Sequence, residues 1–171
     1  QLLKEHQLHA DIKPGEKVFF FTTCGWMMWN WLVTALASEA TIILYEGSPF
    51  FPSQSHLWDI AEEEGIHHFG ISPRYISALS KESIVPKDEF KLEPLRAILS
   101  TGAPLLPDHY QFIHSSIKSD IQISSISGGT DIISCFALSV PILPVFEGEI
   151  QCVGLGMDVN IFSSSGAKEE I

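Results

Sequence analysis

Apolar and polar residues alternate in blocks along most of this chain, with short continuous apolar runs separated by longer segments of helical character. Continuous apolar runs are typical of strands that are buried on both faces of a parallel sheet. The predicted strands are residues 17–22, 41–45, 67–71, 96–100 and 121–126. The predicted helices are residues 26–38, 55–64, 74–80 and 108–117. This alternation predicts an α/β fold, a doubly wound and mostly parallel sheet with flanking helices.

The pattern changes after residue 131. Pro141 and Pro144 indicate a loop, and residues 146–151 and 157–162 are expected to form antiparallel strands. A small antiparallel β substructure therefore begins near residue 148. The two predicted units are an α/β subdomain at residues 1–147 and the incomplete start of a β subdomain at residues 148–171.

Both ends of the chain predict an excerpt of a longer protein. The chain begins without Met, already in a helical pattern, and residues 163–168 resemble a hairpin turn that precedes a second strand. We therefore expect the missing N- and C-terminal parts of the same polypeptide to be its partners. Whether the chain is a natural truncated product is left open.

Composition and charge narrow the classes of partner. The 171 residues are 45% hydrophobic and 18% charged, which is typical of a globular domain with a sizeable core. The net charge of −11, from 21 acidic and 10 basic residues, disfavours nucleic acid and anionic membranes, since either would require clustered Lys and Arg. The longest apolar stretch, residues 26–37, is interrupted by Asn30 and is too short to span a bilayer.

Cysteine spacing and absent motifs exclude further classes. Cys24, Cys135 and Cys152 are widely spaced and lack a CxxC pair, so a reducing cytosol is the expected location. No HExxH pair, GxSxG elbow, GxGxxG turn or Walker lysine occurs. These absences argue against a zinc enzyme, a serine hydrolase and a dinucleotide-binding oxidoreductase.

The most informative motif is Ser-Gly-Gly-Thr-Asp at residues 127–131, which ends a predicted strand. The two glycines let backbone amides approach a ligand, and Thr130 adds a hydroxyl that can face phosphate or carboxylate oxygens. Asp131 can hold a divalent cation. The competing interpretation is a plain turn after a strand.

A second backbone-exposed turn, residues 100–104, follows the preceding predicted strand. Its peptide planes can lie against a flat ring such as adenine, although a simple strand-to-helix connection also explains it locally. The carboxyl ends of successive parallel strands meet at one edge of a sheet. The two turns together therefore favour one crevice for the base and the phosphates of a nucleotide.

Trp26, Met27 and Met28 open the predicted helix at the same edge of the sheet. Core packing explains apolar residues of this kind and is the preferred interpretation for Trp31 and Leu32. In the first turn of a helix, however, free backbone amides attract anions. A small carboxylic acid is therefore a candidate ligand there.

The order of these motifs resembles the adenylate-forming superfamily of acyl-CoA synthetases over nearly the whole chain. The segments that carry the resemblance are residues 14–17, 22–30, 44–49, 98–105, 124–131 and 148–151. The resemblance implies that a carboxylic acid reacts with ATP and Mg²⁺ to form an acyl-adenylate, which CoA then converts to a thioester. It also implies that the phosphate loop precedes this chain, while the ribose-binding residues and the lysine that drives adenylation follow it. The chain alone is therefore expected to be inactive.

The resemblance assigns roles to residues of this chain by their position in each motif. Nucleotide binding falls to Gly102, Ala103, Pro104, Ser125, Gly129 and Thr130. Catalytic roles fall to Thr130, which contacts phosphate, and to Asp131, which stands where the family usually has glutamate and which serves Mg²⁺. The acyl and CoA pocket falls to Trp26, Met27, Met28 and Gly128.

The glycine at position 128 indicates which carboxylic acid is the substrate. Acetyl-CoA synthetases resemble this chain but place a tryptophan at this position, so a glycine opens space for a longer acid. The expected acid is acetoacetate or another short branched or oxo acid, activated in ketone-body use and lipid synthesis. Another short-chain acyl-CoA synthetase and a non-catalytic truncated product remain the alternatives.

Overall fold

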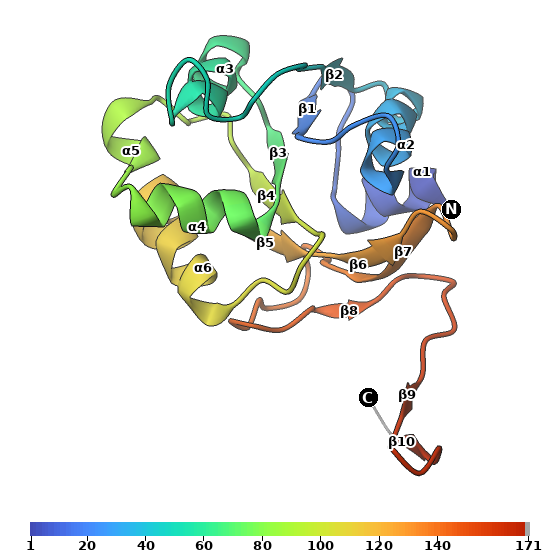
Figure 1. The fold of residues 1–171 in the computed structure, drawn as a ribbon. Coiled ribbons are helices and arrows are strands. Elements are labelled where there is room, and N and C mark those ends of the chain that lie inside the picture. The colour runs from blue at the N-terminus through green and yellow to red at the C-terminus, as the bar shows by residue number, and fades with distance from the viewer. Residues whose placement is uncertain (170–171) are drawn as a thin grey trace.

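The computed structural model describes residues 1–169 and places five parallel strands in one sheet of order β2-β1-β3-β4-β5 (Figure 1). The strands are β1 (Lys17–Phe20), β2 (Thr41–Ile43), β3 (His68–Ile71), β4 (Ala97–Ser100) and β5 (Gln122–Ser125). Each lies within a predicted apolar run, and each neighbouring pair is parallel and in regular register. The predicted fold class is therefore confirmed.

Helices connect the strands as the alternation predicts. They are α2 (Met27–Thr34), continued by the 3₁₀ turn η2 (Ala35–Ser38), α3 (His56–Glu64), α4 (Pro73–Lys81), α5 (Pro86–Glu89), and α6 (Pro107–Phe112), continued by the π-helical turn η3 (Ile113–Ile117). The N-terminal segment forms α1 (Leu2–Lys4) and the π-helical turn η1 (Glu5–His9). Among the described residues, no helix combines the length and apolar character that crossing a bilayer requires.

Local sequence explains where these helices begin and end. The Ser72 hydroxyl accepts a hydrogen bond from the Tyr75 backbone amide at 3.3 Å, and Pro73 occupies the first turn, so α4 has a capped start. Gly65 ends α3 with φ of 62°, a left-handed conformation that glycine adopts without strain. The short helix α5 was not predicted from the sequence because four residues carry no periodic pattern.

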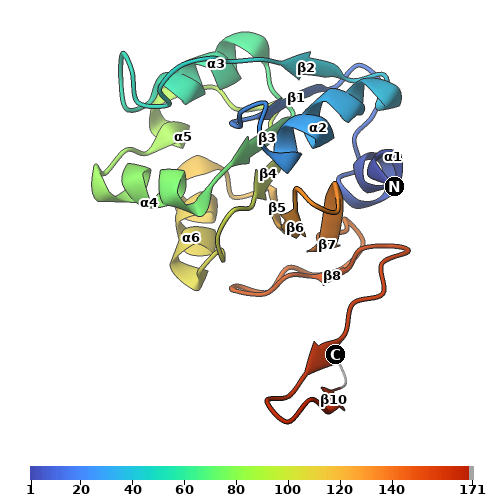
Figure 2. The same ribbon diagram turned by 45° about the vertical axis from the view of Figure 1, so that its right-hand side comes forward.

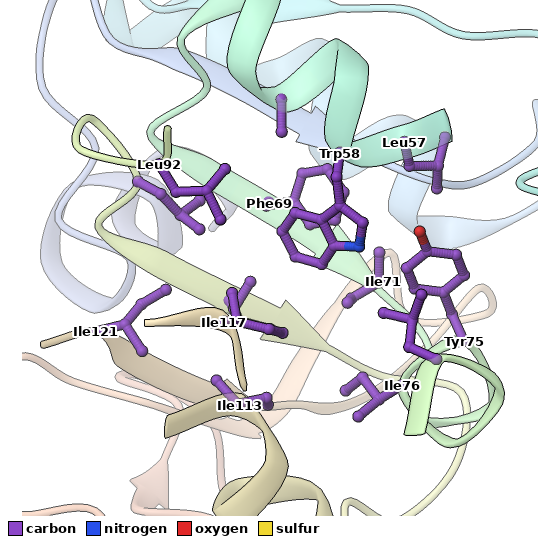
Figure 3. Close-up of a cluster of buried hydrophobic side chains, with 14 of the residues drawn as sticks. Leu57, Trp58, Phe69, Ile71, Tyr75, Ile76, Leu92, Ile113, Ile117 and Ile121 are labelled. Carbon is purple, nitrogen blue, oxygen red and sulfur yellow. The ribbon is translucent and has the colours of Figure 1, made fainter. Parts of the chain in front are cut away.

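The sheet has a hydrophobic core on each face, because alternate side chains of a strand point to opposite sides. Phe19 of β1 packs with α3, α4 and α6, while Val18 and Phe20 pack with α2 on the other face. Figure 1 shows these helices on opposite sides of the sheet. Figure 3 shows the first core, in which the Trp58 and Phe69 rings stack with centroids 4.7 Å apart.

Gly70 makes room for an aromatic ring near the carboxyl edge of the sheet. Gly70 of β3 pairs with Phe20 of β1, and a Cβ atom added at Gly70 would lie 2.1 Å from Cδ2 of the Phe20 ring. The ring therefore occupies the space that any other residue at position 70 would need. A glycine inside a strand often marks such a close approach.

The chain after β5 forms antiparallel strands. A three-stranded sheet contains β6 (Ser127–Gly129), β7 (Ser134–Leu138) and β8 (Cys152–Val153), in that order. A separate hairpin of β9 (Ile161–Phe162) and β10 (Lys168–Glu169) projects away from the rest of the chain in both views (Figures 1 and 2). The second strand of the predicted hairpin turn thus lies within the chain.

Two sequence predictions for this region are wrong in detail. Residues 146–151 form a loop rather than a strand, and of residues 157–162 only β9 is a strand. Gly148, with φ of 82°, interrupts the first of these segments, whose backbone is held by side chains rather than by a neighbouring strand. The predicted boundary at residue 147 stays a prediction, and β8 pairs with β7 across it.

Candidate functional site

Two adjoining cavities open at the carboxyl edge of the parallel sheet. Their volumes are about 500 Å³ and about 370 Å³, and they share Thr101, Gly102, Ile126 and Gly128. Residues that follow β1, β3, β4 and β5 all reach the larger cavity, which lies where the strand order reverses between β1 and β3. Open α/β sheets bind ligands in such crevices.

The larger cavity brings together two of the three segments predicted from the sequence and one end of the third. Of the candidate residues, it is lined by Trp26, Met27, Met28, Gly102, Gly128, Gly129 and Thr130. Thr22, Thr23 and Thr101 also line it and belong to segments that the sequence indicated, whereas the other lining residues were not singled out: Phe20, Phe21, Ser72 and Ile126. Phe20, Phe21, Ser72 and Ile126 lie at the ends of parallel strands and belong to no ligand motif, although their position is a ligand signal once the topology is known.

The smaller cavity contains the candidate residues of the two turns together with a segment that is remote in sequence. Its candidate residues are Gly102, Ala103, Pro104, Ser125 and Gly128, and it is also lined by Thr101, Leu105, Ile126 and Ser127. Gly148 and Ile150 complete it. Sequence reasoning assigned these last two residues to a separate strand, so their contribution was missed.

Thr130 joins the glycine turn to the start of α2. Its Oγ1 atom accepts a hydrogen bond from the backbone amide of Met27 at 3.2 Å. Trp26, at the N-cap position of α2, makes no side-chain cap of its own. Thr130 therefore supplies the capping oxygen from a distant part of the chain, and the phosphate candidate and the acyl-wall candidate are in direct contact.

The shared wall is fixed by a second threonine. The Thr101 hydroxyl donates a hydrogen bond to the backbone carbonyl of Ile126 at 2.8 Å, which ties the turn after β4 to the end of β5. Gly102, with φ of 91°, follows directly, in a conformation that side chains rarely adopt. This tie holds residues 102–104 beside the glycine turn.

Gly128 lies at close quarters with the neighbouring strand. A Cβ atom at this position would lie 2.6 Å from the backbone oxygen of Ser134 and 3.1 Å from Cα of Cys135, whereas a Cβ at Gly129 would meet nothing within 4 Å. The β6–β7 register also shifts between Ser127 and Gly128. A side chain at position 128 would therefore require β7 to shift, whereas one at position 129 would not.

Asp131 lies apart from the other candidates. Its side chain is exposed in the turn between β6 and β7, and it lines neither cavity. Within residues 1–169, its carboxylate makes no hydrogen bond or ion pair, and no group of three or more His, Cys, Asp or Glu side chains could hold a metal ion. Asp131 thus offers a single free carboxylate next to Thr130.

Tyr110 of α6 anchors the outer wall of the smaller cavity. Its hydroxyl donates a hydrogen bond to the carbonyl of Glu149 at 2.8 Å, between the two lining residues Gly148 and Ile150. Burial raises the pKa of Tyr110, so the hydroxyl keeps its proton at neutral pH. Gln151 then ties the segment inward, since its side-chain amide bonds to the Val140, Leu143 and Pro144 carbonyls.

The two cavities have an uncharged lining. In the described part of the chain, none of their lining residues is Asp, Glu, Lys, Arg or His. These walls can bind a ligand through hydroxyls, backbone amides and apolar contact. They do not supply a charged acid, base or phosphate clamp.

A family model described as AMP-binding enzyme matches residues 2–160. The chain belongs to the AMP-binding enzyme family. The acetoacetyl-coenzyme A synthetase of Rhizobium meliloti (strain 1021) is 49% identical to it over 166 residues, which are 97% of this chain and 26% of that protein. The malonamoyl-CoA synthetase of Penicillium aethiopicum is 42% identical over 177 residues, covering 95% of this chain and 24% of that protein.

A solved structure agrees with these sequence matches. The acetoacetyl-CoA synthetase from Streptomyces lividans matches with a TM-score of 0.92 and 43% identity, over 98% of this chain and 26% of that chain. The resemblance to adenylate-forming acyl-CoA synthetases is therefore confirmed. The chain spans about a quarter of the length of the curated relatives that it matches.

Proposed function

We propose that this chain is the part of an ATP-dependent ligase that binds the acid and the base of the nucleotide. The ligase activates acetoacetate to acetoacetyl-AMP and then forms acetoacetyl-CoA. The observation that carries the proposal is the pair of connected, uncharged cavities at the switch point of the sheet, which share a wall at Gly102 and Gly128. Such a pair can hold a nucleotide and a small acid side by side. The matched relatives include acetoacetyl-CoA synthetases of which this chain covers 25–26% of the length.

The smaller cavity is assigned to the nucleotide. Adenine packs against Gly102, Ala103 and Pro104, whose exposed peptide planes present a flat surface, and Ser125 lies beside the edge of the base. Gly129 and Thr130 lead from this cavity into the larger one, so the phosphates extend in that direction. Backbone amides and a hydroxyl are suitable donors for phosphate oxygens.

Magnesium is assigned to Asp131. Mg²⁺ is usually held by one or two carboxylates together with substrate phosphates and waters, so a single carboxylate beside the phosphate-binding threonine suits it. The exposed position of Asp131 and its lack of a protein partner among the described residues support this assignment. The ion would neutralise negative charge on the phosphates of the nucleotide.

The larger cavity is assigned to the acid and to the thiol arm of CoA. Trp26, Met27 and Met28 form an apolar wall at the start of α2, where helix amides favour the acid carboxylate. Gly128 leaves the floor open. A cavity of about 500 Å³ exceeds the volume of a four-carbon acid, so the thioester arm can enter the same space.

The uncharged lining also supports our proposal that the chain needs the rest of its polypeptide. A phosphate loop and a catalytic lysine are expected in the missing N- and C-terminal parts, and without them the chain neither clamps triphosphate nor completes adenylation. The proposed units remain residues 1–147 and 148–171. We place the enzyme in the cytosol, in lipid synthesis from ketone bodies, and the three free cysteines support a reducing compartment.

A second candidate acid follows from the malonamoyl-CoA synthetase relative. Malonamate has the size of acetoacetate but ends in an amide instead of a methyl group. The amide would require hydrogen-bond partners, whereas Phe20, Met27 and Met28 present buried apolar surface. This apolar part of the lining favours acetoacetate, whereas malonamate would have to use the lining hydroxyls, such as those of Ser72 and Thr101.

The test is acid-dependent exchange of pyrophosphate into ATP. It is run on this 171-residue chain and on the full product of its gene, with acetate and malonamate as competing acids. We expect exchange in the full product alone, with acetoacetate preferred. Preference for malonamate would show that malonamate, not acetoacetate, is the substrate of the same reaction. Preference for acetate would refute the argument from Gly128. No exchange in either protein would favour a non-catalytic product.

A further inference from the structure

The N-terminal helical turn η1 forms hydrogen bonds with the chain at both ends of strand β7. At one end, a carboxylate oxygen of Glu5 accepts hydrogen bonds from the Ser134 hydroxyl and from the Cys135 backbone amide, the latter at 3.2 Å. At the other end, His9 Nδ1 bonds to the Ser139 carbonyl at 2.8 Å, and His9 Nε2 accepts from the backbone amide of Leu155 at 3.0 Å. Neither Glu5 nor His9 lines either of the two cavities described above.

The two residues that Glu5 holds are the two that press on Gly128. The Ser134 oxygen and the Cys135 Cα atom lie 2.6 Å and 3.1 Å from the position of a Gly128 Cβ. Gly128 pairs with Cys135 at the register shift, where ladder pairing is irregular. Glu5 therefore acts on β7 directly behind the residue that forms the floor of the acid cavity.

Burial of the Glu5 carboxylate costs free energy of folding. The side chain of Glu5 is 0% exposed, and its second carboxylate oxygen has no hydrogen-bond partner among the described residues. Burial of a partly unpaired charge destabilises a protein, and a well-packed apolar side chain would fill the space without that penalty. The feature that an apolar residue would lack is an acceptor for both β7 donors.

We propose that Glu5 is a positioning residue for the acid cavity, since its carboxylate holds β7 against Gly128 and so sets the depth of the cavity floor. This inference rests on the proposed function only in naming the acid as the ligand of that cavity. It extends the specificity argument from Gly128 to a residue outside the cavity. Loss of Glu5 lets β7 move away from Gly128 and loosens the fit to a small acid.

The experiment compares two buried carboxylates in the full gene product. Glu5→Ala removes the grip on β7, and the matched control Glu16→Ala removes the buried carboxylate at the opposite, amino-terminal edge of the sheet. Both variants are expected to lower the melting temperature. Only Glu5→Ala is expected to raise the KM for acetoacetate, by about tenfold, with the KM for ATP within about twofold of wild type.

Two further variants keep the test informative if Glu5→Ala does not fold. Glu5→Gln retains an oxygen acceptor and is expected to restore the KM for acetoacetate to near the wild-type value. Ser134→Ala removes one of the two donors and is expected to raise that KM by a smaller factor. An unchanged acetoacetate KM in both Glu5→Ala and Ser134→Ala would overturn the proposal.

Hydrogen exchange of the peptide that contains β7 gives a readout independent of catalysis. Glu5→Ala is expected to lose protection at β7, whereas Glu16→Ala keeps it. Equal loss in the two variants would overturn the grip of Glu5 on β7, whichever acid is the substrate. Absence of acetoacetate-dependent exchange in the wild-type enzyme would instead overturn the proposed function.

Discussion

At the scale of single residues, Gly128 serves two demands. Comparison with acetyl-CoA synthetases predicts that a glycine opens the acid pocket, and the structure adds that the backbone of Ser134 leaves no space for a side chain. The second demand concerns the packing of β6 against β7 and not the acid. A substitution at Gly128 therefore changes both the cavity and the strand behind it, and the two effects must be separated.

Three variants separate them. Gly128→Trp is expected to shift acid preference toward acetate, because the indole fills the cavity, and to destabilise the fold because β7 must move. Gly128→Ala is expected to lower the free energy of unfolding by about 1–3 kcal/mol without filling the cavity. Gly129→Ala is the matched control, and it should stay within about 0.5 kcal/mol because its Cβ meets nothing within 4 Å. Urea unfolding and acid-dependent exchange measure the two effects. Unchanged acid preference in Gly128→Trp would refute the pocket argument.

At the scale of elements, the loop at residues 145–151 forms one wall of the smaller cavity through Gly148 and Ile150. Tyr110→Phe removes the hydrogen bond to the Glu149 carbonyl. In the full gene product, we expect the KM for ATP to rise about three- to tenfold, with the acid KM unchanged and a stability loss of about 1 kcal/mol. Gln111→Ala, which removes an exposed contact with Glu147 at 3.1 Å, is the control. Equal effects of the two variants would contradict a specific anchoring role for Tyr110.

The sequence predicted the elements whose apolar pattern is set by the core, and it failed where single contacts decide. The runs at β1 and β4 are apolar because both faces of those strands are buried, so a short continuous apolar run identifies them. Residues 146–151, in which polar residues and Gly148 separate Phe146 from Ile150, were predicted as a strand but form a loop, because Gly148 turns the backbone and the Tyr110 hydroxyl holds the Glu149 carbonyl. No local pattern in the sequence reports such long-range hydrogen bonds.

The same distinction applies to the candidate site. The two glycine turns were found because their residue types carry a ligand signal, and parallel topology brings them to one edge. Ser72 and Ile150 carry no such signal and reach the cavities only through the fold. Glu5 was missed for the same reason, since its contact with Ser134 joins residues at opposite ends of the chain.

At the scale of the whole molecule, charge is separated from the cavities. The amino-terminal edge of the sheet carries an ion network in which Glu16 bonds to His68 Nε2 at 2.9 Å and to Arg96, while Arg96 also pairs with Asp11 at 2.9 Å. The carboxyl edge holds the uncharged cavities. Stability can therefore respond to pH through groups that are remote from the ligand site.

Glu16 of this network and the buried His6 of η1 each make the fold less stable in acid, over different pH ranges. Burial lowers the pKa of His6 to about 4, and its ring packs edge-on against Trp31 with centroids 4.4 Å apart. Burial opposes ionisation of Glu16, yet hydrogen bonds from His68, the Lys13 backbone and Arg96 outweigh it and lower its pKa to about 2. Both folded-state pKa values lie below the unfolded ones, so the unfolded chain binds more protons as the pH falls.

The pH dependence of unfolding distinguishes these two groups. His6 should contribute a loss of about 1.4 kcal/mol per pH unit, beginning below pH 6.5 and ending near pH 4, because only the unfolded chain protonates it there. His6→Phe keeps a ring against Trp31 and should flatten that range.

Glu16→Gln should instead flatten the range from pH 4.5 to about 2 and lower stability at neutral pH, where the ionised carboxylate stabilises the fold. Urea unfolding of the 171-residue chain, followed by tryptophan fluorescence from pH 2 to 8, measures both profiles. An unchanged slope between pH 6.5 and 4 in His6→Phe would show that His6 is not the group that loses stability there.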